Sequence, residues 1–241
     1  PVTAIESATG TVKWVIDFKE TGVVRWIRAG ANNLLLLGSG TDKKVDDYDG
    51  LKKHFEQPLL ICVRKDDGGR LWEYKIEKAE DLGDIHILLC PDDQGEMMLS
   101  PDYTKGFHII KGKRLYCIEN GSGREIWSTE KSAYGAPLLR NDVVYANVDK
   151  KISAYQIKDG SVKWQCDKKV EKTSSLIPAA ADILIAINAG EFKDGRNQGG
   201  YKLHAINAET GQYVWAFDKG SDFNEIESIN ENRIYIAEKD N

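Results

Sequence analysis

The sequence has no long hydrophobic segment and almost no strong helix signal. Its longest apolar run, Leu34 to Leu37, is the length of a strand, whereas a membrane-spanning helix needs roughly 20 residues. No charged segment followed by an apolar one opens the chain, so we expect no signal peptide. Only residues 51–56 could form a single helical turn. These features argue against a helical membrane protein and favour strands throughout.

Residues of metal and redox sites are also scarce. The chain has no C-x-x-C pattern, so neither zinc nor redox chemistry is indicated. Cys62 and Cys117 occupy one position of a repeat in which other copies have Ala, so we interpret them as small buried side chains. Equivalent positions in neighbouring repeats should lie farther apart than the roughly 7 Å between Cα atoms that a disulfide tolerates. The four histidines lack metal-ligand spacing, so we predict no metal site: His54, His86, His108 and His204.

The charge balance argues against a general nucleic-acid partner. The 241 residues include 33 Lys and Arg against 38 Asp and Glu, for a net charge of −5. A polyanion usually needs a basic face, and the basic clusters at 111–114 and 168–169 are short. We interpret them as solvated turns. With 41% hydrophobic residues, the chain can bury a sizeable core as one domain.

Known catalytic and cofactor patterns are missing as well. The acidic segments 46–50 and 92–96 do not fit the calcium-loop pattern, so solvated turns are preferred to cation sites. The glycines at 38–40 and 195–200 lack the following helix of a phosphate loop. No nucleophile elbow is present. We therefore predict no catalytic residue and no cofactor.

What the chain does contain is a motif repeated five times in register. A small residue is followed six positions later by Gly, and four positions after that by Trp. The motif uses five of the six Trp residues in the chain: Ala4, Gly10, Trp14; Cys62, Gly68, Trp72; Cys117, Gly123, Trp127; Ala154, Gly160, Trp164; and Ala205, Gly211, Trp215. Alternating residues flank each Gly turn, so each copy predicts a β-hairpin.

Two further strands precede each complete motif hairpin. The four units so formed have predicted strands at 21–28, 34–37, 59–64, 70–76; 84–90, 96–99, 114–119, 124–128; 136–139, 143–148, 152–157, 162–166; and 175–179, 183–188, 202–207, 213–217. The N-terminus has a motif pair alone, at 2–7 and 11–18. The C-terminus has two plain strands alone, at 224–229 and 233–237.

Four-stranded repeats of about 48 residues are typical of β-propeller blades. We therefore predict an all-β, single-domain propeller of five four-stranded blades over residues 1–241. Residues 1–18 and 221–241 would share the closing blade, joined by ladder hydrogen bonds. The alternative is a piece of a longer propeller that begins and ends inside a blade.

The motif resembles the tryptophan motif of the quinoprotein-like, or PQQ-like repeat, propellers, whose pattern is Ala-x-Asp-x-x-x-Gly-x-x-x-Trp. The resemblance covers essentially the whole chain. It implies that each Trp lies between blades, against the small residue and Gly of other motifs. On that basis, replacing Trp164 or Trp215 by Ala should cost roughly 3–5 kcal/mol. The family favours an extracytoplasmic location, although four apparently unpaired cysteines leave the cytoplasm open.

The enzymes of that family hold pyrroloquinoline quinone and calcium in eight-bladed rings. This chain departs from them in having about five repeats, no adjacent Cys-Cys and no alignable carboxylate cluster. The resemblance therefore indicates a non-enzymatic member. The alternative is a quinone- or sugar-active enzyme with its site at the ring centre or on the insertion loops.

Three predicted insertions separate the second and third strands of their units, which would place them on one face of the propeller. Aromatic residues and Arg are common binding anchors, and loops on a rigid scaffold carry function. We expect a protein partner there, with a small molecule or carbohydrate possible, although any of these residues could simply cap the ring. The candidates are Tyr48, His54, Phe55, Tyr103, Phe107, Phe192 and Arg196.

Overall fold

The computed structural model describes the chain in segments separated by gaps. They are residues 1–17, 24–29, 33–38, 59–76, 86–89, 107–111, 114–119, 121–171, 173, 175–180, 182–189, 192–193, 196–197, 201–218, 223–230 and 233–238. The chain divides into two compact units, Pro1–Ser128 and Thr129–Asn241.

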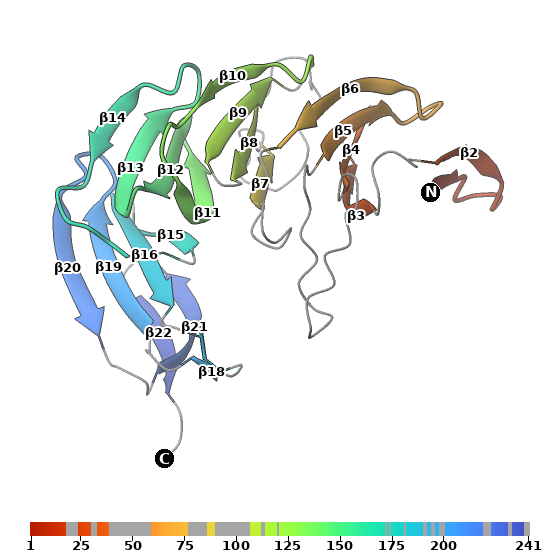
Figure 1. Cartoon of the computed structure of the whole chain (residues 1–241). Coiled ribbons are helices and arrows are strands. Elements are labelled where there is room, and N and C mark those ends of the chain that lie inside the picture. The colour runs from red at the N-terminus through yellow and green to blue at the C-terminus, as the bar shows by residue number, and fades with distance from the viewer. Residues whose placement is uncertain are drawn as a thin grey trace. The chain divides into compact units, whose positions relative to one another are not determined.

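The first unit contains one two-stranded and two four-stranded antiparallel sheets (Figure 1). The small sheet pairs β1 (Val2–Ile5) with β2 (Val12–Ile16). One larger sheet has the order β3-β4-β5-β6, and the other has the order β10-β9-β8-β7. Their strands are β3 (Val24–Ala29), β4 (Asn33–Gly38), β5 (Leu59–Arg64), β6 (Arg70–Lys75), β7 (His86–Leu89), β8 (Phe107–Lys111), β9 (Leu115–Glu119) and β10 (Glu125–Ser128).

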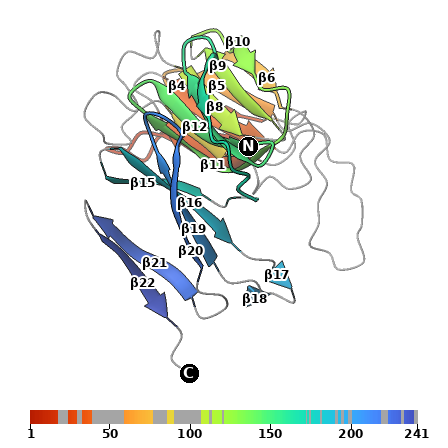
Figure 2. The ribbon, with the colours of Figure 1, turned by 90° about the vertical axis from the view of Figure 1, so that its left-hand side faces the viewer.

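The second unit contains two four-stranded sheets and two hairpins, which are easiest to follow in Figure 2. The sheets have the orders β11-β12-β13-β14 and β15-β16-β19-β20; the hairpins are β17-β18 and β21-β22. The strands are β11 (Ala133–Arg140), β12 (Val143–Val148), β13 (Lys151–Gln156), β14 (Val162–Gln165), β15 (Ser175–Ala180), β16 (Ile183–Ala189), β17 (Phe192–Lys193), β18 (Arg196–Asn197), β19 (Tyr201–Asn207), β20 (Tyr213–Asp218), β21 (Phe223–Asn230) and β22 (Arg233–Glu238).

The all-β prediction is confirmed for the described residues. In each of the four larger sheets, two plain strands are followed by a motif hairpin. Among the same residues, no helix is long and apolar enough to cross a membrane. The single helical turn predicted at 51–56 lies outside the described residues.

One strand was misplaced by the sequence pattern. The strand that pairs with both β7 and β9 is Phe107–Lys111, not the predicted 96–99, which lie outside the described residues. Phe and two Ile make 107–111 the better strand former, whereas two Met residues gave 96–99 little β-propensity. The insertion of this sheet therefore joins its first strand to its second.

The short β17–β18 hairpin was also missed, because two strands of two residues are too short to show a period. The intervening Asp194-Gly195 is a dipeptide that favours tight hairpins, and it was the available signal. β1–β2 and β21–β22 are each a separate two-stranded sheet. Five blades and a shared closing blade therefore remain predictions.

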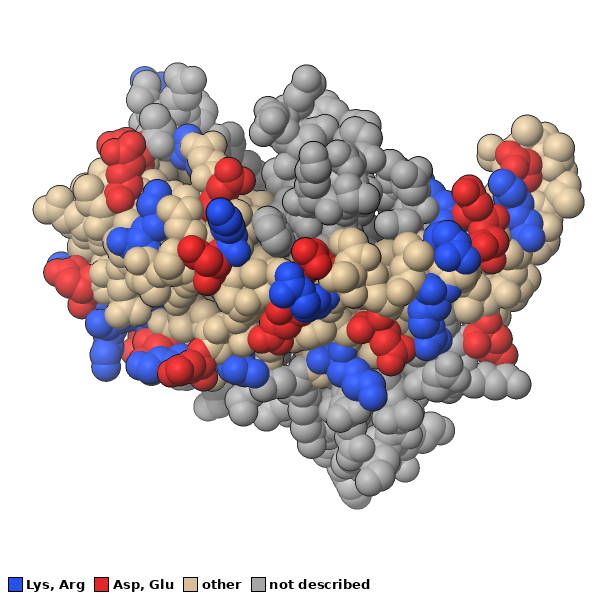
Figure 3. Space-filling model, turned by 90° about the horizontal axis from the view of Figure 1, so that it is seen from above, with Lys and Arg blue, Asp and Glu red and all other residues tan. Residues whose placement is uncertain are grey.

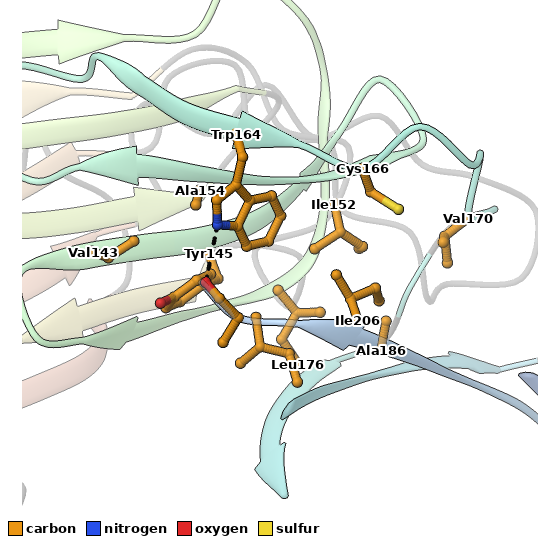
Figure 4. Close-up of a cluster of buried hydrophobic side chains, with 12 residues drawn as sticks. Val143, Tyr145, Ile152, Ala154, Trp164, Cys166, Val170, Leu176, Ala186 and Ile206 are labelled. Atoms are coloured by element: carbon orange, nitrogen blue, oxygen red, sulfur yellow. Dashed lines mark hydrogen bonds between the residues drawn. The ribbon is translucent and has the colours of Figure 1, made fainter. Parts of the chain in front are cut away.

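The core of the second unit lies between its two larger sheets. Trp164, Ile152 and Tyr145 from one sheet pack with Ala186 and Ile206 from the other (Figure 4). All five are less than a tenth exposed. In the first unit, Val2 packs with Leu59, Ile61 and Val63, which ties the N-terminal hairpin to the following sheet.

Candidate functional site

The five motif copies form the same hairpin. In each, the small residue lies directly opposite the Trp on the paired strand, and the register shifts beside that pair. The pairs are Ala4–Trp14, Cys62–Trp72, Cys117–Trp127, Ala154–Trp164 and Ala205–Trp215. A bulge at a constant place bends and twists each hairpin alike. The sequence spacing therefore encodes one local geometry five times.

The motif Gly closes each hairpin turn. Its N–H donates to the carbonyl four residues earlier, at 2.8 Å in the Gly10 turn and 3.1 Å in the Gly68 turn. All five motif glycines have φ between 70° and 75°. This left-handed conformation is unfavourable for residues that have a Cβ atom. The backbone conformation therefore favours Gly at these five positions.

The residue before each motif Gly has a shared role that we did not anticipate. Its side-chain oxygen accepts a hydrogen bond from the N–H of the residue after the Gly, over 2.8–3.3 Å. The five acceptors are Thr9, Asp67, Ser122, Asp159 and Thr210. A signal was present in the sequence, because this position is Ser, Thr or Asp in every copy. These side chains form short turns that favour the bend.

Three motif Trp residues lie against the Gly turn of the following repeat. A Cβ on Gly68 would lie 3.0 Å from Trp14 Cδ2, and one on Gly123 would lie 2.6 Å from Trp72. The indole Nε1–H of Trp14 donates to the Lys65 carbonyl at 2.8 Å. Trp72 is only 7% exposed. These contacts join neighbouring sheets within the first unit.

Trp215 differs from its equivalents. It is 38% exposed, whereas Trp164 is 9% exposed. Val214 and Phe217 of the same strand, β20, are also exposed. In the first unit, a Cβ on Gly10 would meet nothing within 4 Å. The surroundings of Trp215 therefore differ from those of Trp164, and the Gly10 turn lacks the Trp contact found at Gly68, Gly123 and Gly211.

Cys62 and Cys117 are buried, as predicted. Burial raises the pKa of the Cys62 thiol to about 12. A thiol with so high a pKa is protonated at neutral pH and is a poor nucleophile. Cys166 is likewise buried, with its pKa raised mainly by desolvation. Cys90 lies outside the described residues.

A polar cluster surrounds Tyr213 on β20. His204 Nδ1 lies 2.9 Å from the Tyr213 hydroxyl, and Lys168 Nζ lies 4.1 Å from the centre of the Tyr213 ring. Desolvation lowers the pKa of His204, and nearby Lys202 lowers it further, against the opposing effect of Asp218. His204 therefore favours the neutral form and acts here as a hydrogen-bonding side chain.

The predicted binding residues are only partly covered by the structure. Tyr48, His54, Phe55 and Tyr103 lie outside the described residues. Phe107 opens strand β8, opposite Glu119, so its predicted loop position is wrong. Phe192 and Arg196 lie on the two strands of the β17–β18 hairpin, where Phe192 pairs with Asn197 and Lys193 pairs with Arg196.

Strand register also shows where the insertions leave their sheets. Gly38 pairs with Leu59, and Ala189 pairs with Tyr201, at sheet ends remote from the motif turns. Leu89 pairs with His108, at the end where β9 enters its motif turn. The prediction that all three insertions leave on the same side is therefore wrong for the β7–β8 connection, because its second strand was misassigned.

The family model described as outer membrane protein assembly factor BamB matches residues 59–232. The chain belongs to this family. The match agrees with the resemblance to PQQ-like repeat propellers, which was drawn from the Trp motif alone. The comparison with curated proteins found no match to the chain.

Two solved structures share the fold. The BamB structure from Moraxella catarrhalis is 14% identical over 91% of this chain, with a TM-score of 0.52. The computationally designed Ika8 protein is 9% identical over 96% of this chain and 72% of its own, with a TM-score of 0.53. The chain spans 58% of the length of that BamB structure. At these identities the likeness concerns the fold alone.

The described surface carries charges of both signs. Figure 3 shows Lys and Arg interspersed with Asp and Glu over one face. Exposed ion pairs include Arg64–Asp67 and Arg70–Glu73, both at 2.9 Å. No group of three or more His, Cys, Asp or Glu suited to a metal ion occurs within the described segments. The acidic segments 46–50 and 92–96 lie outside them.

Proposed function

We propose that the chain is a non-catalytic β-propeller module that binds protein partners. The observation that carries this proposal is the match of residues 59–232 to a family described as an outer membrane protein assembly factor. An assembly factor acts on other proteins, and this chain shares its repeat over most of its length. The fold also supplies rigid sheets from which connecting segments extend, an arrangement suited to recognition.

The partner surface we propose centres on the connection between β16 and β19. This connection contains the β17–β18 hairpin, with Phe192 and Arg196 on opposite strands. Aromatic residues and Arg are enriched among the side chains that dominate binding energy. We propose a separate binding segment in the first unit, the connection between β4 and β5, which leaves its own sheet at the end remote from the motif turn. This segment contains Tyr48, His54 and Phe55. The β7–β8 connection leaves its sheet at the end next to the motif turn. Tyr103 and Phe107 are therefore not part of this proposed surface.

An affinity-capture experiment tests this proposal. The chain is immobilised and exposed to an extract of its source cells, and captured proteins are compared among three forms. These are the unchanged chain, the double variant Phe192→Ala/Arg196→Ala, and the control variant Lys163→Ala, which changes an exposed residue of β14. We expect a partner that the control retains and the double variant loses. Equal capture by all three forms would contradict the proposed surface.

Calorimetry separates this function from the enzymatic alternative. Stoichiometric binding of pyrroloquinoline quinone together with Ca²⁺ would contradict a non-catalytic module. Titration with each component alone provides the control for non-specific binding.

We further propose a closed ring of five blades in which residues 1–18 and 221–241 share the closing blade. The motif Trp residues would dock each blade onto the next. The β1–β2 hairpin is a motif pair without plain strands, and β21–β22 is a plain pair without a motif hairpin. Small-angle X-ray scattering would distinguish a closed ring from an open array. A profile that only an open array fits would contradict the closing blade.

A further inference from the structure

Strand β20 forms one edge of its sheet, which has the order β15-β16-β19-β20 (Figure 1). Within the part of the chain that the structure describes, no strand pairs with the outer side of β20. Such an edge presents a row of backbone N–H and C=O groups that can pair with a strand of another chain. The side chains of β20 therefore decide whether this edge is protected from such pairing.

The central residues of β20 form a continuous exposed apolar segment. Val214 is 50% exposed, Trp215 is 38% exposed and Phe217 is 39% exposed, and Ala216 is exposed as well. Natural edge strands commonly carry charged side chains that prevent pairing with other chains. β20 has no charged residue within two positions of its Trp, whereas each of the other four motif strands has one: Lys13, Glu73, Glu125 and Lys163.

The register of β20 places its two exposed aromatic side chains on one face of the sheet. Trp215 pairs with Ala205, and Phe217 pairs with Leu203. Residues two positions apart in a strand point to the same face, so Ala216 points to the opposite face. The edge therefore has a small side chain at its centre and an aromatic side chain on either side of it.

We propose that β20 pairs in an antiparallel manner with β20 of a second copy of this chain, about a two-fold axis at Ala216. In this register Ala216 lies opposite the same residue of the second copy. Trp215 lies opposite Phe217 of the second copy, and the symmetry forms this pair twice. Aromatic pairs across neighbouring strands stabilise a sheet. Two four-stranded sheets would thereby become one continuous sheet.

The charges at this edge favour a second copy as the occupant. In the proposed register Asp218 lies opposite Val214 of the second copy, so no two like charges face each other. The Asp218 carboxylate is already paired with Lys202 Nζ at 2.6 Å. A two-fold interface uses the same surface on both copies, so assembly stops at two. The pairing does not rest on the proposed function, because it uses neither the β17–β18 hairpin nor a closing blade.

Light scattering on the full chain over a range of concentrations tests the pairing. We expect twice the mass of one chain, falling to the mass of one chain on dilution. Ala216→Lys should abolish the dimer, since it places two like charges directly opposite each other. Gln165→Lys is the matched control, because Gln165 follows the motif Trp of β14 as Ala216 follows that of β20. A single-chain mass at every concentration, growth beyond two copies, or a dimer that Ala216→Lys leaves intact would overturn the proposal.

A charge exchange provides a second, independent measurement. Ala216→Lys and Ala216→Glu should each be monomeric alone, and an equal mixture should form a dimer because opposite charges then face each other. Circular dichroism checks that both variants are folded. A mixture of folded variants that stays monomeric would contradict the proposed register.

The variant Ala216→Cys tests the register directly and needs no added charge. Residues directly opposite in antiparallel strands have Cα atoms about 4.5–5.5 Å apart, which is within the range of a disulfide. Mild oxidation should therefore link Ala216→Cys into a covalent dimer. Gln165→Cys and the unchanged chain, with its own cysteines, are the controls and should stay unlinked. Failure of Ala216→Cys to link, or equal linking of the control variant, would overturn the assignment of this strand pair.

Discussion

The indole ring of Trp164 lies against Gly211, and its Nε1–H donates to the Ala208 carbonyl at 3.0 Å. Trp164 and Gly211 are 47 positions apart, one repeat length. Trp14 makes the same contacts with Gly68 and Lys65 in the first unit. The same interaction, found in each of the two units, thus joins neighbouring sheets within a unit.

Replacing Trp164 by Ala should destabilise the second unit by roughly 3–5 kcal/mol, because the substitution removes a large buried side chain and leaves a cavity. Denaturant unfolding monitored by circular dichroism measures the change. Trp164→Phe serves as the control, since it keeps an aromatic ring but loses the bond to Ala208 and should cost less. A midpoint unchanged in Trp164→Ala would contradict the packing role.

The costs of Trp215→Ala and Trp164→Ala distinguish an open array from the proposed closed ring. With Trp215 38% exposed, its replacement by Ala should cost distinctly less in an open array. The sequence alone predicted equal costs, because both residues occupy the same motif position. The comparison also tests the proposed ring: closure would bury Trp215 and bring the two costs together. Parallel unfolding curves of the two variants measure the difference.

Gly211→Ala should be more damaging than Gly10→Ala. Both residues have positive φ, which costs an L-residue about 1–2 kcal/mol. At Gly211 a Cβ would also lie 2.5 Å from Trp164 Cε3, whereas at Gly10 it would meet nothing within 4 Å. Thermal unfolding of both variants checks the order. A Gly10 variant as unstable as the Gly211 variant would show that the Gly10 turn is also covered.

Replacing Asp159 by Ala should lower the stability of the fold, because the Gly160 turn loses a hydrogen bond. The change removes the acceptor of the Ser161 N–H, 2.9 Å away in the Gly160 turn. Asp159→Asn keeps an acceptor and should recover most of the loss. Equal stability of the Ala and Asn variants in denaturant unfolding would argue against this role.

Stability should fall as the pH drops below about 6.5, the ordinary pKa of His, in part because of His204. Desolvation lowers the folded-state pKa of His204. The unfolded chain therefore binds a proton at a pH where the folded chain does not, and stability rises with pH in that window. Stability curves from pH 5 to pH 7.5 test this. In His204→Gln the decline should be shallower; an identical slope would assign it to other groups.

Much of the fold could be read from local pattern. The spacing of Ala205, Gly211 and Trp215 is repeated five times, and each copy forms the predicted hairpin because Gly turns and alternation act over neighbouring residues. The weaker predictions failed where a local signal was short. The short apolar segment 97–99 led to a predicted strand at 96–99, although Phe107–Lys111 forms the second strand of that sheet. The two-residue strands β17 and β18 had no period to detect.

The candidate site was harder to predict, since binding residues in connecting segments follow no repeat. The pairing of Leu89 with His108 shows that the β7–β8 connection leaves its sheet at the end next to the motif turn, whereas the other two insertions leave theirs at the remote end. The acceptors before each motif Gly were visible as Ser, Thr or Asp, but their role required the turn geometry.

The sequence by itself determined most of the strands, the five motif hairpins and the repeat, because these depend on residues close together along the chain. Only the tertiary structure decided that Trp164 is buried while Trp215, with the same motif, is exposed. It also decided that the Asn147 amide holds Val170 and Glu171. Burial and hydrogen bonding of these residues depend on which segments, distant in the sequence, pack against them. A local sequence pattern does not predict those segments.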